Sequence, residues 1–160
     1  MSCTVVAHDD RAPGAIPEVE LHRWARLAEA AATHEGGVGE LTLTFVELDE
    51  MAALNGEHLG KAGPTDVVSF PMDDEPVPGV PTLLGDIVVC PAVAAAQYAE
   101  HAGTFDDELA LLIVHGVLHV LGHDHAEPEE TERMRKRELD LLERFHWHGS
   151  APAGFRQAQD

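Results

Sequence analysis

The feature that most constrains this chain is an almost uninterrupted apolar run from Leu109 to Leu121, broken only by a glycine and two histidines. A helix that is apolar on nearly every side has no face suited to water, so we expect it to lie buried at the centre of the domain. Thr104, followed three residues later by Asp107, has the pattern of a capping box and predicts where this helix begins. Gly122 predicts its end, because glycine readily adopts the left-handed conformation of a helix C-terminus.

The stretch HGVLHVLGHDH, residues 115–125, contains four histidines. On a helix, His115 and His119 are four residues apart and project from the same face. Gly122 allows the chain to turn back, so that His125 can approach the same point from another direction. The pattern HxxxHxxGxxH therefore predicts one Zn²⁺ ion bound by three imidazoles, with a fourth coordination position left for water. The alternative is hydrogen-bonded histidines without a metal, although burying three neutral imidazoles costs several kcal/mol unless each is paired.

The rest of the chain alternates segments of strand and helix character. Strands are expected at 3–9, 40–48, 66–70 and 85–90, and further helices at 17–34, 49–58, 91–103 and 127–147. We therefore expect an α/β (α+β) domain in which helices cover a mixed sheet of about four strands. We expect residues 1–148 to form this single domain and residues 149–160 to form a flexible tail. The sequence does not predict the order of the strands.

Composition limits the function classes that this chain can serve. With 10 Lys and Arg against 29 Asp and Glu, the net charge is −19, so a nucleic acid must be held by local contacts and not by a general basic field. Half of the basic residues lie in 127–147, where Glu129 and Glu132 precede Arg133 and Lys136 by four residues and predict salt-bridged pairs. With no leader-like segment, no apolar run of about 20 residues and no CxxC motif, we expect a cytoplasmic protein without a disulfide framework.

Gly116 separates this chain from a familiar class of zinc enzyme. Zinc peptidases with the spacing HExxHxxGxxH carry a glutamate directly after the first histidine, and that glutamate acts as the general base. Here the same position is a glycine. The sequence therefore argues against ordinary peptide hydrolysis.

Three motifs together resemble one protein family. HGVLHVLGHDH, with GPTDVVSFP at 63–71 and LLGDIVVCP at 83–91, resembles the YbeY family of bacterial metal-dependent endoribonucleases. The resemblance runs from about Leu41 to Leu142. It implies an enzyme that cleaves single-stranded RNA and acts in maturation of the 16S rRNA 3′ end and in ribosome quality control. Its partners would be rRNA and the ribosome or ribosomal proteins, with neither DNA nor a membrane expected.

The resemblance also implies roles for particular residues. His115, His119 and His125 would bind one zinc ion, and His115 would thereby take part in catalysis. The segment Thr65–Phe70 would form a wall of the cleft, and Asp86 would lie near it as a catalytic acid. One departure from the family pattern concerns an arginine that many members carry shortly before the TD pair. Leu59 stands at that place here, and neither Lys61 nor His58 has the two-pronged geometry of a guanidinium.

Two other functions share the same histidines. A metallohydrolase acting on a peptide or another amide would use them with a different substrate. A non-catalytic ribosome assembly factor would use zinc only to fasten the helix end to the loop, with four protein ligands and no exchangeable water. For the endoribonuclease, we expect the metal to lower the pKa of bound water or to polarise a phosphodiester oxygen.

Overall fold

The computed structural model describes residues 2–59, 66–72, 77–123 and 126–157, without the side chains of His58 and Leu59. Its strands are β1 (Cys3–Asp9), β2 (Gly39–Phe45), β3 (Val67–Pro71) and β4 (Leu83–Val89). Its α-helices are α1 (Leu21–His34), α2 (Leu48–Leu54), α3 (Pro91–Gln97), α4 (Phe105–Val120) and α5 (Pro128–Phe145). A short π-helix, η1 (Asn55–Leu59), follows α2, and a short 3₁₀-helix, η2 (Tyr98–Glu100), follows α3. The expected elements are all present in this part of the chain, and their bounds differ from the expected ones by a few residues.

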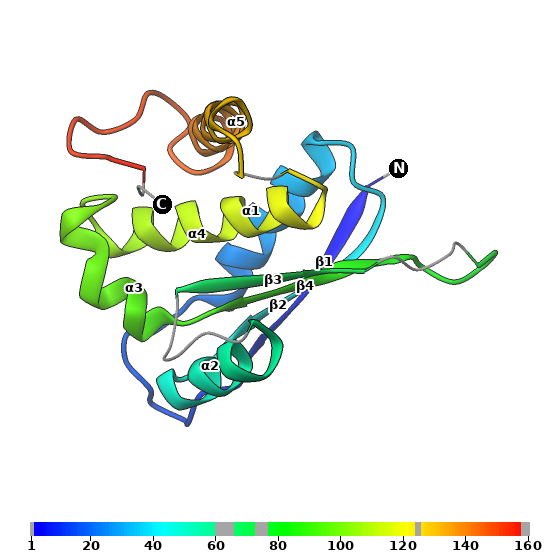
Figure 1. The fold of residues 1–160 in the computed structure, drawn as a ribbon, viewed down its shortest axis with the longest axis horizontal. Helices are drawn as coiled ribbons and strands as arrows, with labels where there is room; N and C mark the ends of the chain where they lie inside the picture. The colour runs from blue at the N-terminus through cyan, green and yellow to red at the C-terminus, as the bar shows by residue number, and fades with distance from the viewer. Residues whose placement is uncertain (1, 60–65, 73–76, 124–125, 158–160) are drawn as a thin grey trace.

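The described strands form one mixed sheet, as the sequence predicts. The order is β1-β2-β4-β3, in which β1, β2 and β4 are parallel and β3 pairs with β4 in the antiparallel direction. Helices α1 and α4 pack on one face of this sheet, α5 lies over α4, and α2 lies on the opposite face (Figure 1). The fold is thus an α+β arrangement of layers, and α4 is its middle layer.

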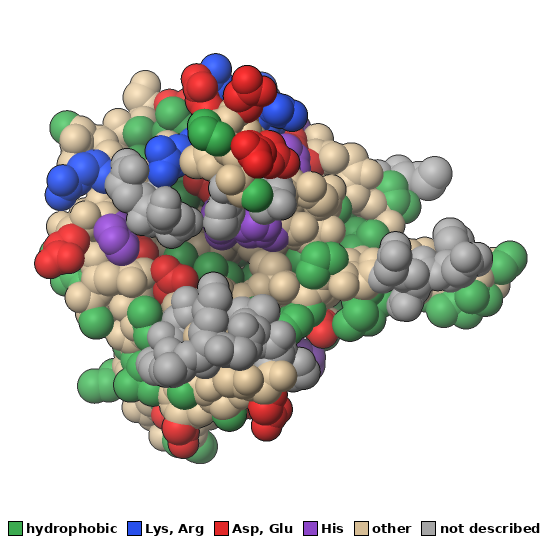
Figure 2. Space-filling view, viewed as in Figure 1, with side chains coloured by type: hydrophobic (Ala, Val, Ile, Leu, Met, Phe, Trp, Pro, Cys, Tyr) green, Lys and Arg blue, Asp and Glu red, His purple; other side chains and the backbone are tan. Residues whose placement is uncertain are grey.

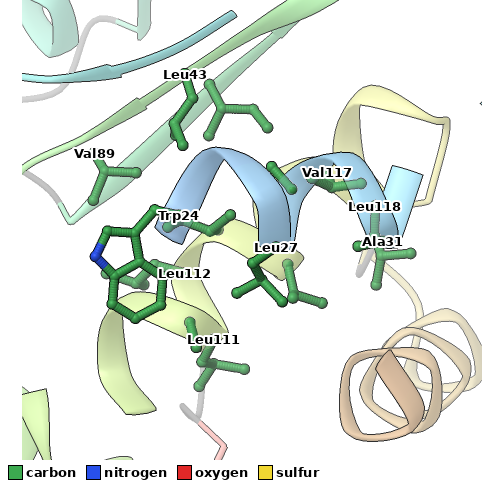
Figure 3. Close-up of a cluster of buried hydrophobic side chains, with 14 of the residues drawn as sticks. Trp24, Leu27, Ala31, Leu43, Val89, Leu111, Leu112, Val117 and Leu118 are labelled. Atoms are coloured by element: carbon green, nitrogen blue, oxygen red, sulfur yellow. The ribbon is translucent and has the colours of Figure 1, made fainter. Parts of the chain in front are cut away.

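Helix α4 is buried because it is enclosed by the sheet, α1 and α5. From Asp107 to Val120 every residue is buried except two, His115 and His119. Figure 3 shows side chains of α1 and α4 meeting side chains from the strands, and the labelled members of this core are Trp24, Leu27, Ala31, Leu43, Val89, Leu111, Leu112, Val117 and Leu118. Thr104 caps the helix as expected, since its hydroxyl accepts a hydrogen bond from the backbone N–H of Asp107. The prediction of a buried central helix is confirmed.

The end of α5 is tied to the start of α4. The buried Asp107 carboxylate accepts hydrogen bonds at Oδ1 from Trp147 Nε1, at 2.9 Å, and from the His146 ring, at 2.7 Å. After α5 the chain turns back toward α4 (Figure 1). In this segment, for which the sequence predicts a flexible tail, Phe155 packs edge-on against Trp147 with ring centroids 4.8 Å apart. Residues up to 157 thus make specific contacts with the domain.

None of the described helices has both the length and the apolar character that a bilayer crossing requires.

Both cysteines are buried free thiols, and this generates a prediction. Burial, followed by the negative charges of Glu29 and Glu40, raises the pKa of Cys3 to about 11, and burial also raises the pKa of Cys90. At pH 8 almost no thiolate is present, and the thiolate is the reactive form. We expect no reaction of the native protein with an aromatic disulfide reagent over minutes, and two thiols per chain in guanidinium chloride. A rapid reaction of either thiol in the native protein would contradict this burial.

Candidate metal-binding site

The two histidines of α4 converge at one point. The Nε2 atoms of His115 and His119 lie 3.1 Å apart, with ring centroids 4.5 Å apart and ring planes at 77°. Two imidazoles bound to one tetrahedral zinc ion, each at about 2.0–2.1 Å, have nitrogens roughly 3.3 Å apart. The pair therefore fits a shared ion, and the same separation also suits a direct N–H···N hydrogen bond between the two rings. Figure 2 shows histidine side chains at the surface near the middle of the viewed face, over α4.

Burial of the surrounding helix fixes these two side chains. They are the only partly exposed positions in the well-packed stretch 107–120, so the helix cannot rotate or slide without disrupting the core. The helix then ends as predicted at Gly122, which has a φ of 103°. The backbone N–H of His123 donates to the Leu118 carbonyl and that of Gly122 donates to the His119 carbonyl, which is the Schellman arrangement. The chain therefore reverses directly beside the histidine pair.

A buried carboxylate on α5 completes the described part of the site. Glu138 is 4% exposed, and its Oε2 lies 2.6 Å from Nδ1 of His115. A carboxylate accepts at this distance, so Nδ1 of His115 carries the proton and Nε2 keeps its lone pair. Carboxylates commonly hold the non-ligating nitrogen of metal-binding histidines in this way. The arrangement prepares His115 to bind a cation through Nε2.

Sequence reasoning missed Glu138, although a signal was present. On α5 the buried positions are Met134, Glu138, Leu141 and Leu142, which follow helical spacing. Glu138 is thus an acid on the apolar face of an amphipathic helix. Buried carboxylates need a partner, so this position could have been matched to one of the helix α4 histidines.

The third predicted ligand, His125, lies outside the described residues, as does its neighbour Asp124. Within the described ranges no three His, Cys, Asp or Glu side chains form a group that could hold a metal ion. His123, the remaining histidine of the motif, lies 3.9 Å from a carboxylate oxygen of Glu35. The structure therefore brings together His115, His119 and Glu138, and it places His123 beside Glu35.

Asp86 is not part of this group. Side chains of β4 alternate between the two faces of the sheet, and Ile87 and Gly85 face α4, where they meet Gly116 and Val120. Asp86 therefore points to the opposite face, where it accepts a hydrogen bond from the Thr42 hydroxyl and lines a hollow of about 470 Å³ with Glu50 of α2. The structure thus places Asp86 on the face of the sheet away from His115 and His119, and the expectation that it lies near the cleft as a catalytic acid stays a prediction.

The expected cleft wall is described only from Asp66 onward, since Thr65 lies outside the described residues. Within it, β3 runs beside α4, and the Ser69 hydroxyl donates to the carbonyl of Gly116 at 3.3 Å. The segment thus lies next to His115. Leu59 stands where many family members carry an arginine, and its side chain is outside the described part of the structure.

The basic residues of α5 are largely neutralised by acids. Arg137 binds both carboxylate oxygens of Glu35 and also Asp140, and the hydrogen bond with Glu35 raises the pKa of Arg137 further above its ordinary value. Lys136 pairs with Glu132 at 3.5 Å, as predicted. Figure 2 shows basic and acidic side chains interspersed over α5. This helix is therefore a mixed surface and not a basic one.

Comparisons with known proteins agree on one family. Residues 11–146 match the family model described as Endoribonuclease YbeY. An "Endoribonuclease YbeY" of Nocardia farcinica is 48% identical over 152 residues, which cover 90% of this chain and 80% of that protein. One of Frankia casuarinae is 45% identical over 144 residues, or 84% and 70% of the two chains. A solution structure from Thermotoga maritima superposes with a TM-score of 0.57 at 26% identity, covering 94% of this chain and 97% of that one.

The close packing at Gly116 generates a prediction. A Cβ at this position would lie 2.7 Å from Cγ2 of Ile87 and 3.2 Å from Oγ of Ser69, so the Ile87 side chain or the strand that carries it would have to shift. We expect Gly116→Ala to lower the free energy of unfolding by about 1–3 kcal/mol despite the better helix propensity of alanine. Urea unfolding followed by circular dichroism measures this.

Gly149→Ala is the matched control, because a Cβ there meets nothing within 4 Å. Its free energy of unfolding should stay within about 0.5 kcal/mol of the wild type. If Gly116→Ala were as stable as this control, α4 would not pack on the sheet as closely as described.

Proposed function

The chain belongs to the YbeY family of endoribonucleases, and from this premise we propose that it is a zinc-dependent enzyme that cleaves single-stranded RNA. Membership of the family makes it an endoribonuclease, a hydrolase of RNA phosphodiester bonds. We propose further that its substrate is rRNA, that it acts in maturation of the 16S rRNA 3′ end and in ribosome quality control, and that it works in the cytoplasm. The observation that most supports metal dependence is the 3.1 Å separation of the two Nε2 atoms.

Three residues are proposed to hold the metal. His115 and His119 would bind it through Nε2, and His125, beyond the Gly122 turn, would supply a third nitrogen. A zinc ion bound in this way supplies Lewis acidity, which polarises a phosphoryl oxygen and lowers the pKa of water. With three protein ligands, one coordination position remains for a reactant.

The protein's own groups prepare that position. Glu138 keeps the proton of the neutral His115 ring on Nδ1, so that the opposite nitrogen, Nε2, has its lone pair available. The packed core holds the two imidazoles in place before any ligand arrives, which avoids reorganisation during the reaction. β3 lies alongside through Ser69, and the adjoining surface is where an RNA strand would have to approach.

Hydrolysis of an amide is not favoured by this geometry. A peptidase with this histidine spacing needs a glutamate at the position of Gly116. A Cβ there would already lie 2.7 Å from Ile87 Cγ2. The site therefore has no room for that general base. For phosphodiester cleavage its absence would be less damaging, because a bound metal would itself lower the pKa of water.

Electrostatics determines how the substrate must arrive. With a net charge of −19, and with Lys136, Arg137 and Arg144 of α5 paired with acids, the protein has no general basic field that would attract RNA from a distance. We propose that the ribosome or one of its proteins brings the rRNA to the enzyme. Cleavage of free RNA should then be slow, because repulsion between the acidic protein and RNA opposes binding.

The proposal predicts the behaviour of a histidine variant. Zinc-loaded wild-type protein should cleave a labelled single-stranded RNA, and His119→Ala should lower the rate at least ~100-fold, because the metal contributes several kcal/mol to such reactions. Gel analysis of the fragments measures this. His22→Ala is the control, since His22 is an exposed residue of α1 and should leave the rate unchanged. Equal cleavage by wild type and His119→Ala, prepared identically, would rule out catalysis at this site.

A further inference from the structure

The Glu138 carboxylate is held at both of its oxygens. Oε2 faces Nδ1 of His115 at 2.6 Å, and Oε1 accepts a hydrogen bond from Nε2 of Gln157 at 2.9 Å. Gln157 belongs to the segment that follows α5 and turns back beside it (Figure 1). A side chain 19 residues further along the chain therefore contacts the carboxylate that orients His115.

The side-chain amide of Gln157 is fixed in one orientation. Its Nε2 donates both to Glu138 and, also at 2.9 Å, to the backbone carbonyl of Arg135. Both partners are acceptors, so a flipped amide would place its own oxygen against two oxygens. Because the Arg135 carbonyl is part of the rigid backbone of α5, the amide links the Glu138 carboxylate to that backbone. The terminal torsion of a glutamate is otherwise broad and weakly restrained.

The segment that carries Gln157 is itself anchored. Phe155 packs against Trp147, and the backbone N–H of Arg156 donates to the carbonyl of His101 at 3.2 Å. Trp147 is in turn bonded to the buried Asp107 of α4. These contacts lie on either side of the turn and hold Gln157 in one position. Its hydrogen bond to Glu138 is thus supported by packing and does not depend on an exposed side chain alone.

We propose that Gln157 is a positioning residue for the metal site and acts on His115 through Glu138. The inference rests on the proposed function, because it assumes that His115 binds the metal. Groups behind a ligating histidine set its tautomer and direction, and their loss weakens metal binding. By holding Oε1, Gln157 keeps Oε2 directed at His115 and provides a partner for a buried charge that would otherwise be half satisfied. The C-terminal segment is then part of the functional site.

Zinc affinity tests this directly. Competition with a chromogenic chelator at fixed pH gives the zinc dissociation constant of the wild type and of Gln157→Ala. We expect the variant to bind about three- to tenfold more weakly, less than the ~10–100-fold typical of a group in direct contact with the ligating histidine. Gln157→Glu, which keeps the size but replaces the donor by a carboxylate, should weaken binding at least as much. An affinity equal to the wild type in both variants would overturn the inference.

Arg156→Ala is the matched control, because Arg156 is the neighbouring residue of the same segment and its only described bond to the domain is through its backbone. Its zinc affinity should stay within about twofold of the wild type. Thermal unfolding of the metal-free proteins should show a cooperative transition for every variant, with a lower midpoint for Gln157→Ala and Gln157→Glu, which leave the buried Glu138 carboxylate less well paired. A loss of affinity in Arg156→Ala equal to that in Gln157→Ala would indicate general loosening of the segment and contradict a positioning role.

A double-mutant cycle separates action through Glu138 from a generic effect. In a Glu138→Ala background, Gln157→Ala should change zinc affinity by less than about twofold, because the group through which it acts is gone. The same fold-loss in both backgrounds would overturn the inference while leaving the metal site intact. A wild-type protein that binds no zinc would instead overturn the proposed metal site, and the inference with it.

Discussion

The contact between Nδ1 of His115 and the buried carboxylate of Glu138 is the interaction on which the site depends. It joins α4, the central helix, to α5, the outer one, and it determines which nitrogen of His115 faces outward. A buried carboxylate is stable only with partners, and an imidazole in a half-buried position needs its tautomer defined. The His115 ring gives the Glu138 carboxylate a hydrogen-bond partner, and the carboxylate defines the tautomer of His115. The described geometry of the pair with His119 follows from this contact and from the packing of α4.

The position of α4 explains how the side chains of His115 and His119 are held in fixed places. Its residues from Asp107 to Val120 are enclosed except where His115 and His119 emerge. Gly116 lets the helix approach β4 so closely that even a Cβ would collide with Ile87. The same close approach excludes the glutamate of a peptidase. One glycine thus contributes both to the fold and to the choice of chemistry.

Much of this was predictable from sequence because it rests on local patterns. The apolar run, the Thr104 cap and the glycine at 122 determine where α4 begins and ends, and a spacing of four puts His115 and His119 on one face. The place of Asp86 was not predictable in the same way. Apolar side chains lie on both faces of β4, since Leu84 and Val88 share the face of Asp86, so alternation alone does not tell which face meets α4.

Contacts between segments that are distant in the sequence were the second kind of feature that could not be predicted. Strand order depends on the pairing of strands that are far apart in the chain. β2 is a direct neighbour of β4 in the sheet, although β3 lies between them in the sequence. Glu138 left a signal, as an acid at a buried position of an amphipathic helix. Gln157 left no signal in the sequence. A polar residue in an irregular C-terminal segment has the same sequence pattern whether or not it packs against the domain.

An anomalous-scattering crystal structure of the zinc-soaked protein would test the central claim most directly. The account predicts one zinc peak about 2.0–2.1 Å from Nε2 of both His115 and His119, with Nδ1 of His115 still on Glu138. Saturating zinc that leaves the two Nε2 atoms in contact with each other and no peak between them would contradict it.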